Sequence, residues 1–296
     1  MSPMTVVIPA FGDTPELREA VASVLGQDSD DWTLLVLDDG PPDGALAGWF
    51  GGLDPRVRYQ HNPNRLGINR NFQQALDLAS GDLLVMLGAD DRLLPSYVRV
   101  MGAAAAAHPA AAWLHPGVQV IDERGAVCRP LADRVKARLS VREPGLHGGQ
   151  ELAASLLRGN WMYFPAITFR AETARRHGFR PGYEIVLDLD LYLRLLLAGE
   201  SAVLVPTVCF QYRRHRASLS SEQRTTGQRF DEEQQYFLAQ ARLLDEFGWP
   251  RAARAARWHV SSRLHALTVL PGVLRDRRWD AAGGLLGHAL TPPPVS

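Results

Sequence analysis

The sequence predicts an α/β protein with a mainly parallel sheet, and three observations lead to this prediction. Strand and helix patterns alternate from the N-terminus to about residue 121, the apolar runs are short, and acidic residues follow two of them. Strands joined through helices in this order form parallel sheets with right-handed crossovers. With 296 residues and 46% hydrophobic content, the chain is long enough to bury a large core.

The first predicted strand covers residues 5–8 and ends at Pro9. A helix follows it, because Thr14 can cap a helix N-terminus and Pro15 suits the first helical position. The apolar residues of this helix recur on one face, so we expect the helix to pack against the sheet.

Further strands are predicted over residues 32–37, 57–60, 83–87 and 110–121, and a helix over residues 69–79. The run 83–87 is apolar throughout and lies between two glycines, as in a central strand that is covered on both faces. These elements complete the βαβα series of the first part of the chain.

Two adjacent carboxylates, Asp90 and Asp91, follow the apolar run 83–87. Ligand sites of open α/β sheets lie at the carboxyl ends of strands. A divalent cation such as Mg²⁺ uses one or two protein carboxylates and completes its shell with phosphate oxygens and water. The pair therefore indicates a metal-diphosphate site. The alternative is the N-cap of a helix with Pro95 in its first turn.

Phe11 and the pair Asp38-Asp39 follow the first two strands, so we expect them at the same sheet edge as Asp90 and Asp91. A base stacked on Phe11 and hydrogen-bonded by Asp39 would place its diphosphate near the second acidic pair. The alternatives are core packing for Phe11 and a simple Asp-Gly turn for Asp39. Because the chain has no G-x-G-x-x-G motif after the first strand and no P-loop, side chains and a metal would hold the nucleotide.

The middle of the chain is less regular. Residues 122–149 are rich in Arg, Pro and Gly and predict a long loop, a kind of segment that is often functional. A helix over 150–158 and a strand over 166–170 enclose an aromatic cluster at 160–165, and a strand over 202–210 follows later. Core packing is the favoured interpretation of the aromatic cluster, with a platform for sugar binding as the alternative.

Two acids, Asp188 and Asp190, open a predicted helix over residues 187–195. The helix dipole favours negative charge at this end, so ordinary N-terminal chemistry is one explanation. A carboxylate in this place can also act as a general base, which is the catalytic explanation.

The last part of the chain, residues 221–296, predicts helices over 230–247 and 252–270 and ends in a proline-rich tail. Residues 251–278 contain seven arginines and one acid, with apolar residues between them. The favoured interpretation is packing on the rest of the chain with the arginines in solvent. Contact of an amphipathic helix with a membrane surface or a partner is the alternative.

Charge and cysteine content restrict the partners and the compartment. The formal net charge is +0, which gives no general attraction to nucleic acid. Cys128 and Cys209 have no metal-ligand spacing and are typical of thiols in a reducing compartment. Since the chain shows neither a leader nor an apolar run of membrane length, we expect a cytoplasmic protein, peripheral at the inner face of the membrane if residues 251–278 bind there.

Several motifs in order resemble the family 2 glycosyltransferases, which have the GT-A fold. Four of them are V-V-I-P-A-F at 6–11, V-L-D-D-G at 36–40, N-R-L-G-I-N-R-N-F at 64–72 and G-D-L-L-V-M-L-G-A-D-D at 81–91. The segment 187–191 is similar to the family's Glu-Asp-x-Asp-Leu pattern without its first acid, and 212–220 is similar to its Tyr-Arg-x-His-x-x-Ser-x-Ser segment. Gly88, where many members have Asp, and Pro41-Pro42 depart from the family pattern.

The resemblance implies roles for residues of the nucleotide-sugar site. Phe11 would flank the base, Asp39 would contact it, and Asp90 would lie near the ribose. Asp91 would bind the divalent metal. Other residues implied at the nucleotide-sugar site are Pro9, Ala10, Gly67 and Asn71.

The resemblance also implies the catalytic base and a further metal contact. The family's base falls on Asp188, and Asp190 is the competing assignment. His215 would ligate the metal or hydrogen-bond the diphosphate.

The implied enzyme is an inverting, metal-dependent glycosyltransferase with Mn²⁺ or Mg²⁺ as cofactor, of the kind that builds cell-surface polysaccharides or glycoconjugates. The donor would be a UDP-sugar or a dTDP-sugar, and the acceptor a glycan, a lipid-linked glycan or a small molecule. The catalytic domain would span residues 1–220, with a nucleotide-sugar part at about 1–122 and an acceptor part at about 123–220. The helical extension 221–296 would follow it.

Proteins of two other classes are the alternatives to this enzyme. A sugar nucleotidyltransferase would carry a glycine-rich N-terminal signature with Arg and Lys, which this chain lacks. A non-catalytic nucleotide-sugar-binding protein would lose the metal acid or the base, whereas Asp91 and Asp188 are both present.

Overall fold

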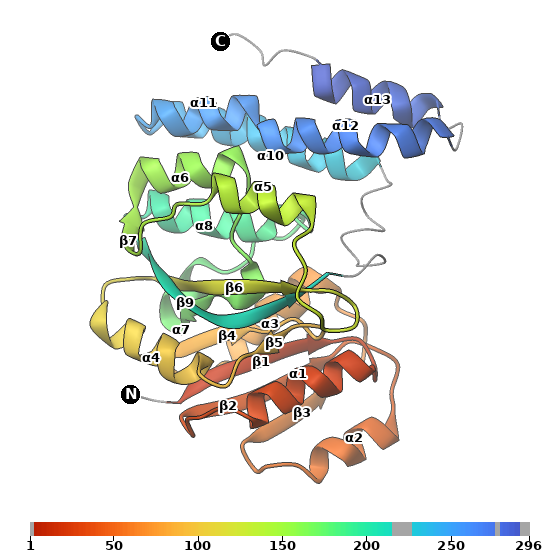
Figure 1. The fold of residues 1–296 in the computed structure, drawn as a ribbon, viewed down its shortest axis with the longest axis vertical. Coiled ribbons are helices and arrows are strands. Elements are labelled where there is room, and N and C mark those ends of the chain that lie inside the picture. Colours follow the sequence, from red (N-terminus) through yellow and green to blue (C-terminus); the bar gives the residue numbers. More distant parts are fainter. Residues whose placement is uncertain (1–2, 215–226, 276–278, 291–296) are drawn as a thin grey trace.

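The computed structural model describes residues 3–214, 227–275 and 279–290, and its centre is a nine-stranded sheet (Figure 1). The strands lie in the order β3-β2-β1-β4-β8-β6-β9-β5, and β7 pairs with β9 outside this path. The strands are β1 (Met4–Ala10), β2 (Trp32–Asp38), β3 (Val57–His61), β4 (Leu83–Met86), β5 (Arg92–Leu93), β6 (Trp113–Ile121), β7 (Gly145–Gly148), β8 (Thr168–Arg170) and β9 (Ser201–Arg213).

Helices cover both faces of this sheet. They are α1 (Pro15–Leu25), α2 (Gly44–Gly51), α3 (Ile68–Leu78), α4 (Tyr97–Ala107), α5 (Leu131–Leu139), α6 (Gly149–Arg158), the 3-10 helix η1 (Phe164–Ala166), α7 (Ala171–His177), α8 (Leu187–Leu197), α10 (Gly227–Glu246), α11 (Pro250–Trp258), α12 (Val260–Arg275) and α13 (Trp279–Leu290). In Figure 1, α5, α6 and α8 lie between the sheet and a layer that contains α10, α11 and α12.

The predicted α/β fold with a mainly parallel sheet is confirmed. β1 lies between β2 and β4 and runs parallel to both, and β3 runs parallel to β2. The sheet is mixed because β8 runs antiparallel to both β4 and β6. Since β8 and β9 share one sheet with β1 to β4, the predicted nucleotide-sugar and acceptor parts are built on a common framework.

The N-terminus of α1 forms as the sequence predicts. The Thr14 hydroxyl accepts a hydrogen bond from the Leu17 N–H at 3.1 Å, and Pro15 occupies the first turn. The prediction that the preceding strand ends at Pro9 is wrong, because β1 continues to Ala10. β4 pairs only with residues 5–7 of β1, so Pro9, which is in register with Leu37 of β2, lies beyond the part of β1 that pairs with β4.

The predicted long loop at residues 122–149 is wrong, since this segment contains α5 and β7. Helix-end signals were present: Asp133 lies in the first turn of α5, and Lys136 and Arg138 lie in its last turn. These charges complement the helix dipole. The high Arg, Pro and Gly content of the segment concealed them.

Two further helices differ from the prediction. α2 was not predicted because it is rich in glycine, although the Asp43 carboxylate caps it by accepting the N–H groups of Ala45 and Leu46. The single predicted helix at 252–270 is two helices, α11 and α12, which are separated at His259 with φ at 25°. The buried His259 ring stacks on Phe237 at 5.3 Å between ring centroids, which stabilises this break.

One apolar core lies on each face of the sheet. The first contains side chains from α1, α2 and α4. The second contains side chains from α3, α6, α8, α10 and α11, together with Trp161 and Phe164. The favoured core packing of the aromatic cluster at 160–165 is therefore confirmed.

The C-terminal helices α10 and α11 pack on the rest of the chain. The alanine face of α11 is buried in the second core, while Arg251 pairs with Glu151 and Arg257 with Asp245. This confirms the packing interpretation for α11. Contact with a membrane surface through residues 251–278 stays a prediction.

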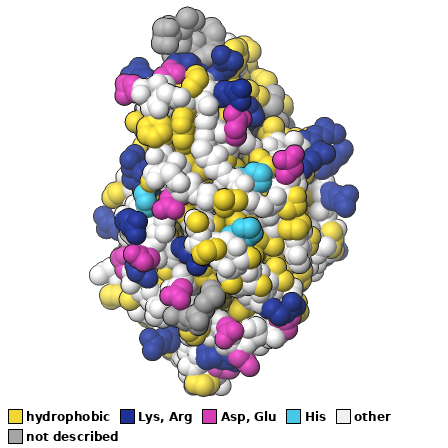
Figure 2. Space-filling view, turned by 90° about the vertical axis from the view of Figure 1, so that its left-hand side faces the viewer, with side chains coloured by type: hydrophobic (Ala, Val, Ile, Leu, Met, Phe, Trp, Pro, Cys, Tyr) yellow, Lys and Arg dark blue, Asp and Glu magenta, His cyan; other side chains and the backbone are white. Residues whose placement is uncertain are grey.

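The surface carries both signs of charge. On the face shown in Figure 2, basic and acidic side chains are interspersed and hydrophobic side chains gather toward the middle. Among the described residues, no helix combines the length and the apolar character that crossing a membrane requires.

Candidate active site

The carboxyl ends of β1, β2 and β4 meet at one edge of the sheet, where the predicted site residues gather. Ala10 is in register with the last residue of β2, and the Asp39 N–H donates to the Ala10 carbonyl at 2.9 Å. β4 ends on the other side of β1. Phe11, Asp39 and the pair Asp90-Asp91 therefore leave neighbouring strands at the same edge.

Asp91 is buried, with 1% of its surface exposed, and its two oxygens have different surroundings. Oδ1 accepts the backbone N–H of Arg213 at 2.8 Å. The alternative of a helix cap is wrong, because α4 begins only at Tyr97. Oδ2 is buried and has no hydrogen-bond partner among the described residues. Burial, followed by the charge of Asp90, raises the pKa of Asp91.

Gly88 makes room for this carboxylate. A Cβ at position 88 would lie 2.6 Å from Oδ2 of Asp91 and 3.1 Å from Oδ1 of Asp90. Any side chain there would displace at least one of the two carboxylates. Gly88, where many family members have Asp, therefore suits a loop in which the Asp90 and Asp91 carboxylates pack against this position.

The residues present fit a divalent cation that is coordinated mainly by the oxygens of a bound diphosphate. Within the described ranges, no three His, Cys, Asp or Glu side chains gather into a metal site. The unpaired Oδ2 of Asp91 would supply one hard oxygen ligand, and a cation bound with a diphosphate takes its other ligands from phosphate and water. His215, the second predicted metal ligand, lies outside the described residues.

Arg213, at the end of β9, holds the loop that carries Asp90 and Asp91, the acidic loop, in place. It was not predicted as part of the site. Its Nε donates to the Asp90 carbonyl at 2.7 Å, and its Nη2 donates to Glu19 of α1 at 2.5 Å. The Arg213 side chain is buried. The only sequence signal for this role was its place in the segment 212–220.

Asp39 organises the loop that leads into α3. Its Oδ1 accepts the Leu66 N–H at 2.7 Å and the Asn62 side-chain amide at 3.2 Å, and its Oδ2 accepts the Gly67 N–H at 2.8 Å. Asn62 also donates to the buried Asn71 at 3.2 Å. The contacts shown for Asp39, Gly67 and Asn71 are within the protein, and their contact with a nucleotide stays a prediction.

Asp38 fixes the turn after β1 and was not predicted to do so. Its Oδ1 accepts the N–H groups of Gly12 at 2.8 Å and Gly40 at 2.9 Å, and its Oδ2 accepts the Tyr59 hydroxyl at 2.7 Å. A Cβ on Gly40 would lie 2.4 Å from the Gly12 nitrogen, so only glycine allows this approach.

Phe11 is exposed, with 54% of its surface accessible, so the alternative of core packing is wrong. The guanidinium carbon of Arg65 lies 4.8 Å from the centre of the ring. Pro9 and Ala10 precede the ring within β1. An exposed aromatic ring beside an arginine forms a surface on which a base can stack.

The two acids of α8 have different partners. Asp188 is partly exposed, and its Oδ2 accepts the Asn160 side-chain amide at 2.7 Å. Burial of the carboxyl group raises the pKa of Asp188. Asp190 is buried and lies 2.7 Å from Arg194 and 3.5 Å from Arg180.

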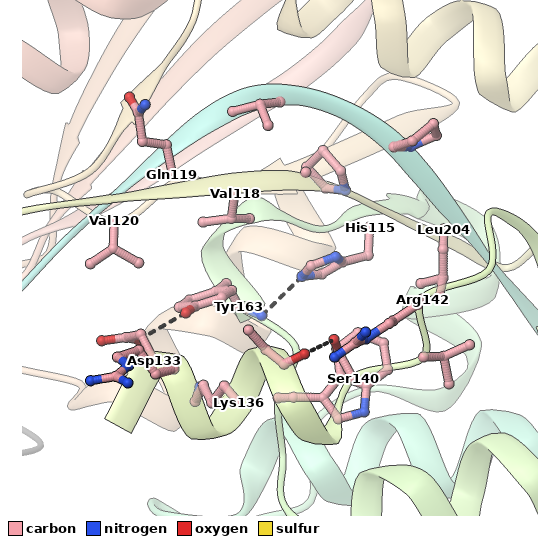
Figure 3. Close-up of a pocket in the computed structure, with 18 of the residues that line it drawn as sticks. His115, Val118, Gln119, Val120, Asp133, Lys136, Ser140, Arg142, Tyr163 and Leu204 are labelled. Carbon is pink, nitrogen blue, oxygen red and sulfur yellow. Dashed lines mark hydrogen bonds between the residues drawn. The ribbon is translucent and has the colours of Figure 1, made fainter. Parts of the chain in front are cut away.

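A cavity of about 670 Å³ lies between α5 and the strands β6 and β9 (Figure 3). The Tyr163 hydroxyl donates to Asp133 at 2.8 Å on one side, and the Tyr163 N–H donates to His115 at 3.1 Å on the other. Asp133 also accepts two hydrogen bonds from Arg214, at 2.6 Å and 3.0 Å. No pattern in the sequence indicates this cavity, because residues 122–149 predict a loop in place of α5.

The lining of the cavity includes chain neighbours or partners of residues that contact the two carboxylates. Trp161 lines it, and the neighbouring Asn160 holds Asp188. Asp133 also lines it and pairs with Arg214, whose neighbour Arg213 donates its N–H to Asp91. The cavity lining is thus linked to each carboxylate through contacts of neighbouring residues.

Loops at the carboxyl ends of strands form the ligand sites of open α/β sheets, and here such loops carry Asp39, Asp90 and Asp91. The model of glycosyl transferase family 2 matches residues 5–164, and the chain belongs to this family.

A curated relative and two solved structures are similar to this chain over most of its length. An uncharacterised protein of Mycobacterium tuberculosis is 28% identical over 288 residues, which cover 93% of this chain and 86% of that protein. The structure of Staphylococcus aureus TarS residues 1–349 with UDP-GlcNAc has a TM-score of 0.64 at 12% identity, over 98% of this chain and 92% of that one. The mannosyltransferase PcManGT of Pyrobaculum calidifontis, with GDP-Man and Mn²⁺, has a TM-score of 0.62 at 17% identity, over 98% and 87% of the two chains. At these identities the two structures show that the fold is shared.

Proposed function

We propose that the protein is an inverting glycosyltransferase that uses a nucleotide diphosphate sugar, a divalent metal on Asp91 and Asp188 as general base. The single observation that carries this proposal is the cavity whose lining is linked, through Asn160 and Arg213, to contacts with these two carboxylates. A sugar held there by its diphosphate near Asp91 would have an acceptor hydroxyl near Asp188. UDP is the proposed nucleotide and dTDP the alternative, and the TarS neighbour binds UDP-GlcNAc.

Asp188 is preferred to Asp190 as the base because of their partners. Both oxygens of Asp190 face arginines, with Oδ2 2.7 Å from Arg194 and Oδ1 3.5 Å from Arg180, so this carboxylate is engaged within the protein. Asp188 is oriented by a neutral amide, and burial raises its pKa, which makes it more basic. In the proposed reaction, the Asp188 carboxylate takes the proton of the acceptor hydroxyl. The acceptor oxygen then forms a bond to the anomeric carbon as the bond to the diphosphate breaks.

The remaining residues would bind and orient the donor. The exposed ring of Phe11 would stack on the base, and the loop fixed by Asp39, Gly67 and Asn71 would border it. Asp90 would lie near the ribose. A divalent cation, when bound, supplies positive charge that stabilises the leaving diphosphate. The open Oδ2 of Asp91 is its proposed protein ligand.

The domain organisation is also a proposal. Residues 1–220 would form the catalytic unit, and residues 221–296 would form an extension that packs on α6 through α11. The two parts of the catalytic unit, about 1–122 and 123–220, would supply the donor site and the acceptor site.

Donor binding is tested by thermal unfolding of the full chain. We expect UDP with Mn²⁺ to raise Tm, because a ligand at 100 times its Kd stabilises a protein by about 2.7 kcal/mol. UDP with a chelator is expected to give a smaller shift, and uridine with Mn²⁺ a smaller one still. Arg58→Gln, at an exposed position of the edge strand β3, is the control and should keep the full shift. If no nucleoside diphosphate changes Tm with either metal, the proposed donor site is wrong.

A further inference from the structure

Lys136 is the only lysine of a chain that has 32 lysine and arginine residues together. It lies on α5 and lines the cavity, where its Nζ is 4.6 Å from the centre of the Tyr163 ring. In Figure 3, Lys136 lies next to Tyr163, below the strands that form the opposite wall. An ammonium group is a compact charge with three donors that rotate freely, and it binds phosphate as a point charge.

The charge of Lys136 acts on groups inside the site. Against the larger effect of burial, it lowers the pKa of Asp188, the proposed base, and it contributes after burial to the low pKa of His115, about 3. Lys136 and Trp161 line the same cavity, and Asn160, next to Trp161, donates to Asp188. An acceptor has to lie beside Asp188 if Asp188 takes its proton.

Positive charge predominates among the charged residues around the cavity. These residues are Arg129, Asp133, Arg134, Lys136, Arg138 and Arg142. Asp133, the one acid, is buried and already accepts hydrogen bonds from Arg214 and Tyr163. A cleft lined by one sign of charge attracts ligands of the opposite sign, and several cations favour a doubly charged group.

The remaining lining is largely apolar. It includes Val118, Val120, Trp161, Leu204 and Val208. Such walls can accommodate the uncharged part of a ligand, while the basic side chains bind its charged part. The cavity thus combines a basic side on α5 with an apolar side on β6 and β9.

We propose that this cavity binds the acceptor and that the acceptor carries a phosphate group contacted by Lys136. The proposal rests on the proposed function, since it names the substrate class of the second site of the same reaction. The phosphate anchors the acceptor, and a hydroxyl of the same molecule faces Asp188. The donor diphosphate binds elsewhere, on the side of Asp91.

Binding of a phosphate group beside Lys136 can be tested directly, because a chain with one lysine gives one lysine signal after chemical labelling. Reductive methylation with ¹³C-formaldehyde labels the full chain at Lys136 and at the N-terminal amine alone, so NMR shows two labelled sites. We expect glucose 6-phosphate to shift the Lys136 signal with saturation, while glucose leaves it unchanged and the N-terminal signal stays in place. The shift is expected to persist when UDP and Mn²⁺ are present. Sodium chloride of matched ionic strength is the control for screening.

Three outcomes would overturn the proposal. The first is that glucose 6-phosphate fails to shift the Lys136 signal. The second is that glucuronate shifts this signal with equal affinity, which would indicate an acceptor with a carboxylate. The third is loss of the shift when UDP and Mn²⁺ are added, which would place Lys136 at the donor diphosphate. Failure of UDP to raise Tm would instead contradict the donor site, so the two failures are distinguishable.

Variants provide an independent readout by calorimetric titration with glucose 6-phosphate. Lys136→Met is expected to weaken binding at least tenfold, and Lys136→Arg to restore most of it because it keeps the charge. Arg58→Gln, which removes an exposed charge far along the sheet at β3, is expected to bind as the wild type does. The effect of UDP on Tm should be the same in all four proteins. Equal affinity of Lys136→Met and the wild type for glucose 6-phosphate would contradict the role of Lys136.

Discussion

Asp188→Asn is expected to lower kcat for glycosyl transfer by about 10²- to 10⁴-fold, the usual contribution of a general base. The amide oxygen can still accept the hydrogen bond that Asn160 donates, while the amide nitrogen replaces the Oδ1 that accepts the Leu189 N–H. The amide cannot take a proton. Steady-state kinetics with a nucleotide sugar measure kcat, and the effect of UDP on Tm checks that donor binding is unchanged.

The neighbouring acid provides the matched control. Asp190→Asn weakens the pairs with Arg194 and Arg180 in a buried place, so we expect it to lower Tm while kcat of the folded enzyme changes little. If Asp188→Asn keeps substantial turnover and Asp190→Asn loses it, the base is Asp190.

The protonation of Asp188 is expected to set how the rate of transfer depends on pH. Burial raises the pKa of Asp188, so the carboxylate becomes protonated at a higher pH than an exposed aspartate does. The rate should fall as the pH decreases through that raised pKa, because the protonated acid cannot accept the proton of the acceptor.

Asp91→Asn is expected to remove the metal dependence of the enzyme and to lower kcat by about 10²-fold or more, since the cation would stabilise several kcal/mol of charge on the diphosphate. The amide oxygen can still accept the Arg213 N–H, so the acidic loop should keep its position. The neutral amide group, however, places a weak ligand for a hard cation where the unpaired Oδ2 of Asp91 lies in the wild type.

Metal binding can be measured apart from catalysis. In the wild type, Mn²⁺ should increase the effect of UDP on Tm, whereas in Asp91→Asn the effect of UDP should be the same with Mn²⁺ and with chelator. Asp91→Ala is less informative, because it also leaves the buried Arg213 N–H without its acceptor. Full metal dependence in Asp91→Asn would move the metal ligand to another residue.

The parallel half of the sheet was predictable because its signals are local. The strands ending before Phe11, Asp39 and the acidic pair are short apolar runs with acids or turn residues after them. Register then brings these ends to one edge, which is a general property of parallel sheets. The position of the candidate site therefore followed from the sequence.

The contacts within the site were not predictable in the same way. Arg213 reaches the Asp90 carbonyl and Glu19, which lie 123 and 194 residues away along the chain, and no local pattern encodes such contacts. The same holds for Asn160, which is far from Asp188 along the chain. Asp39 was assigned to the base from resemblance, whereas its shown partners are the backbone groups of Leu66 and Gly67.

The segment around α5 shows a different kind of failure. Its helix-end charges were present in the sequence, but a nine-residue helix with exposed Leu131 and Val135 has little apolar periodicity. Its position depends on tertiary contacts such as the pair of Asp133 with Arg214. Because the sequence predicts no helix here, it predicts neither the cavity nor the place of Lys136 in its lining.

The stereochemistry of donor cleavage tests the central claim most directly. Full-length protein with Mn²⁺ and an α-configured donor such as UDP-glucose can be followed by ¹H NMR while water serves as the acceptor. A single displacement with Asp188 as base should release the β-sugar first, before mutarotation forms the α-sugar. If the α-sugar appears first, the reaction retains configuration, and the mechanism proposed for Asp188 is contradicted.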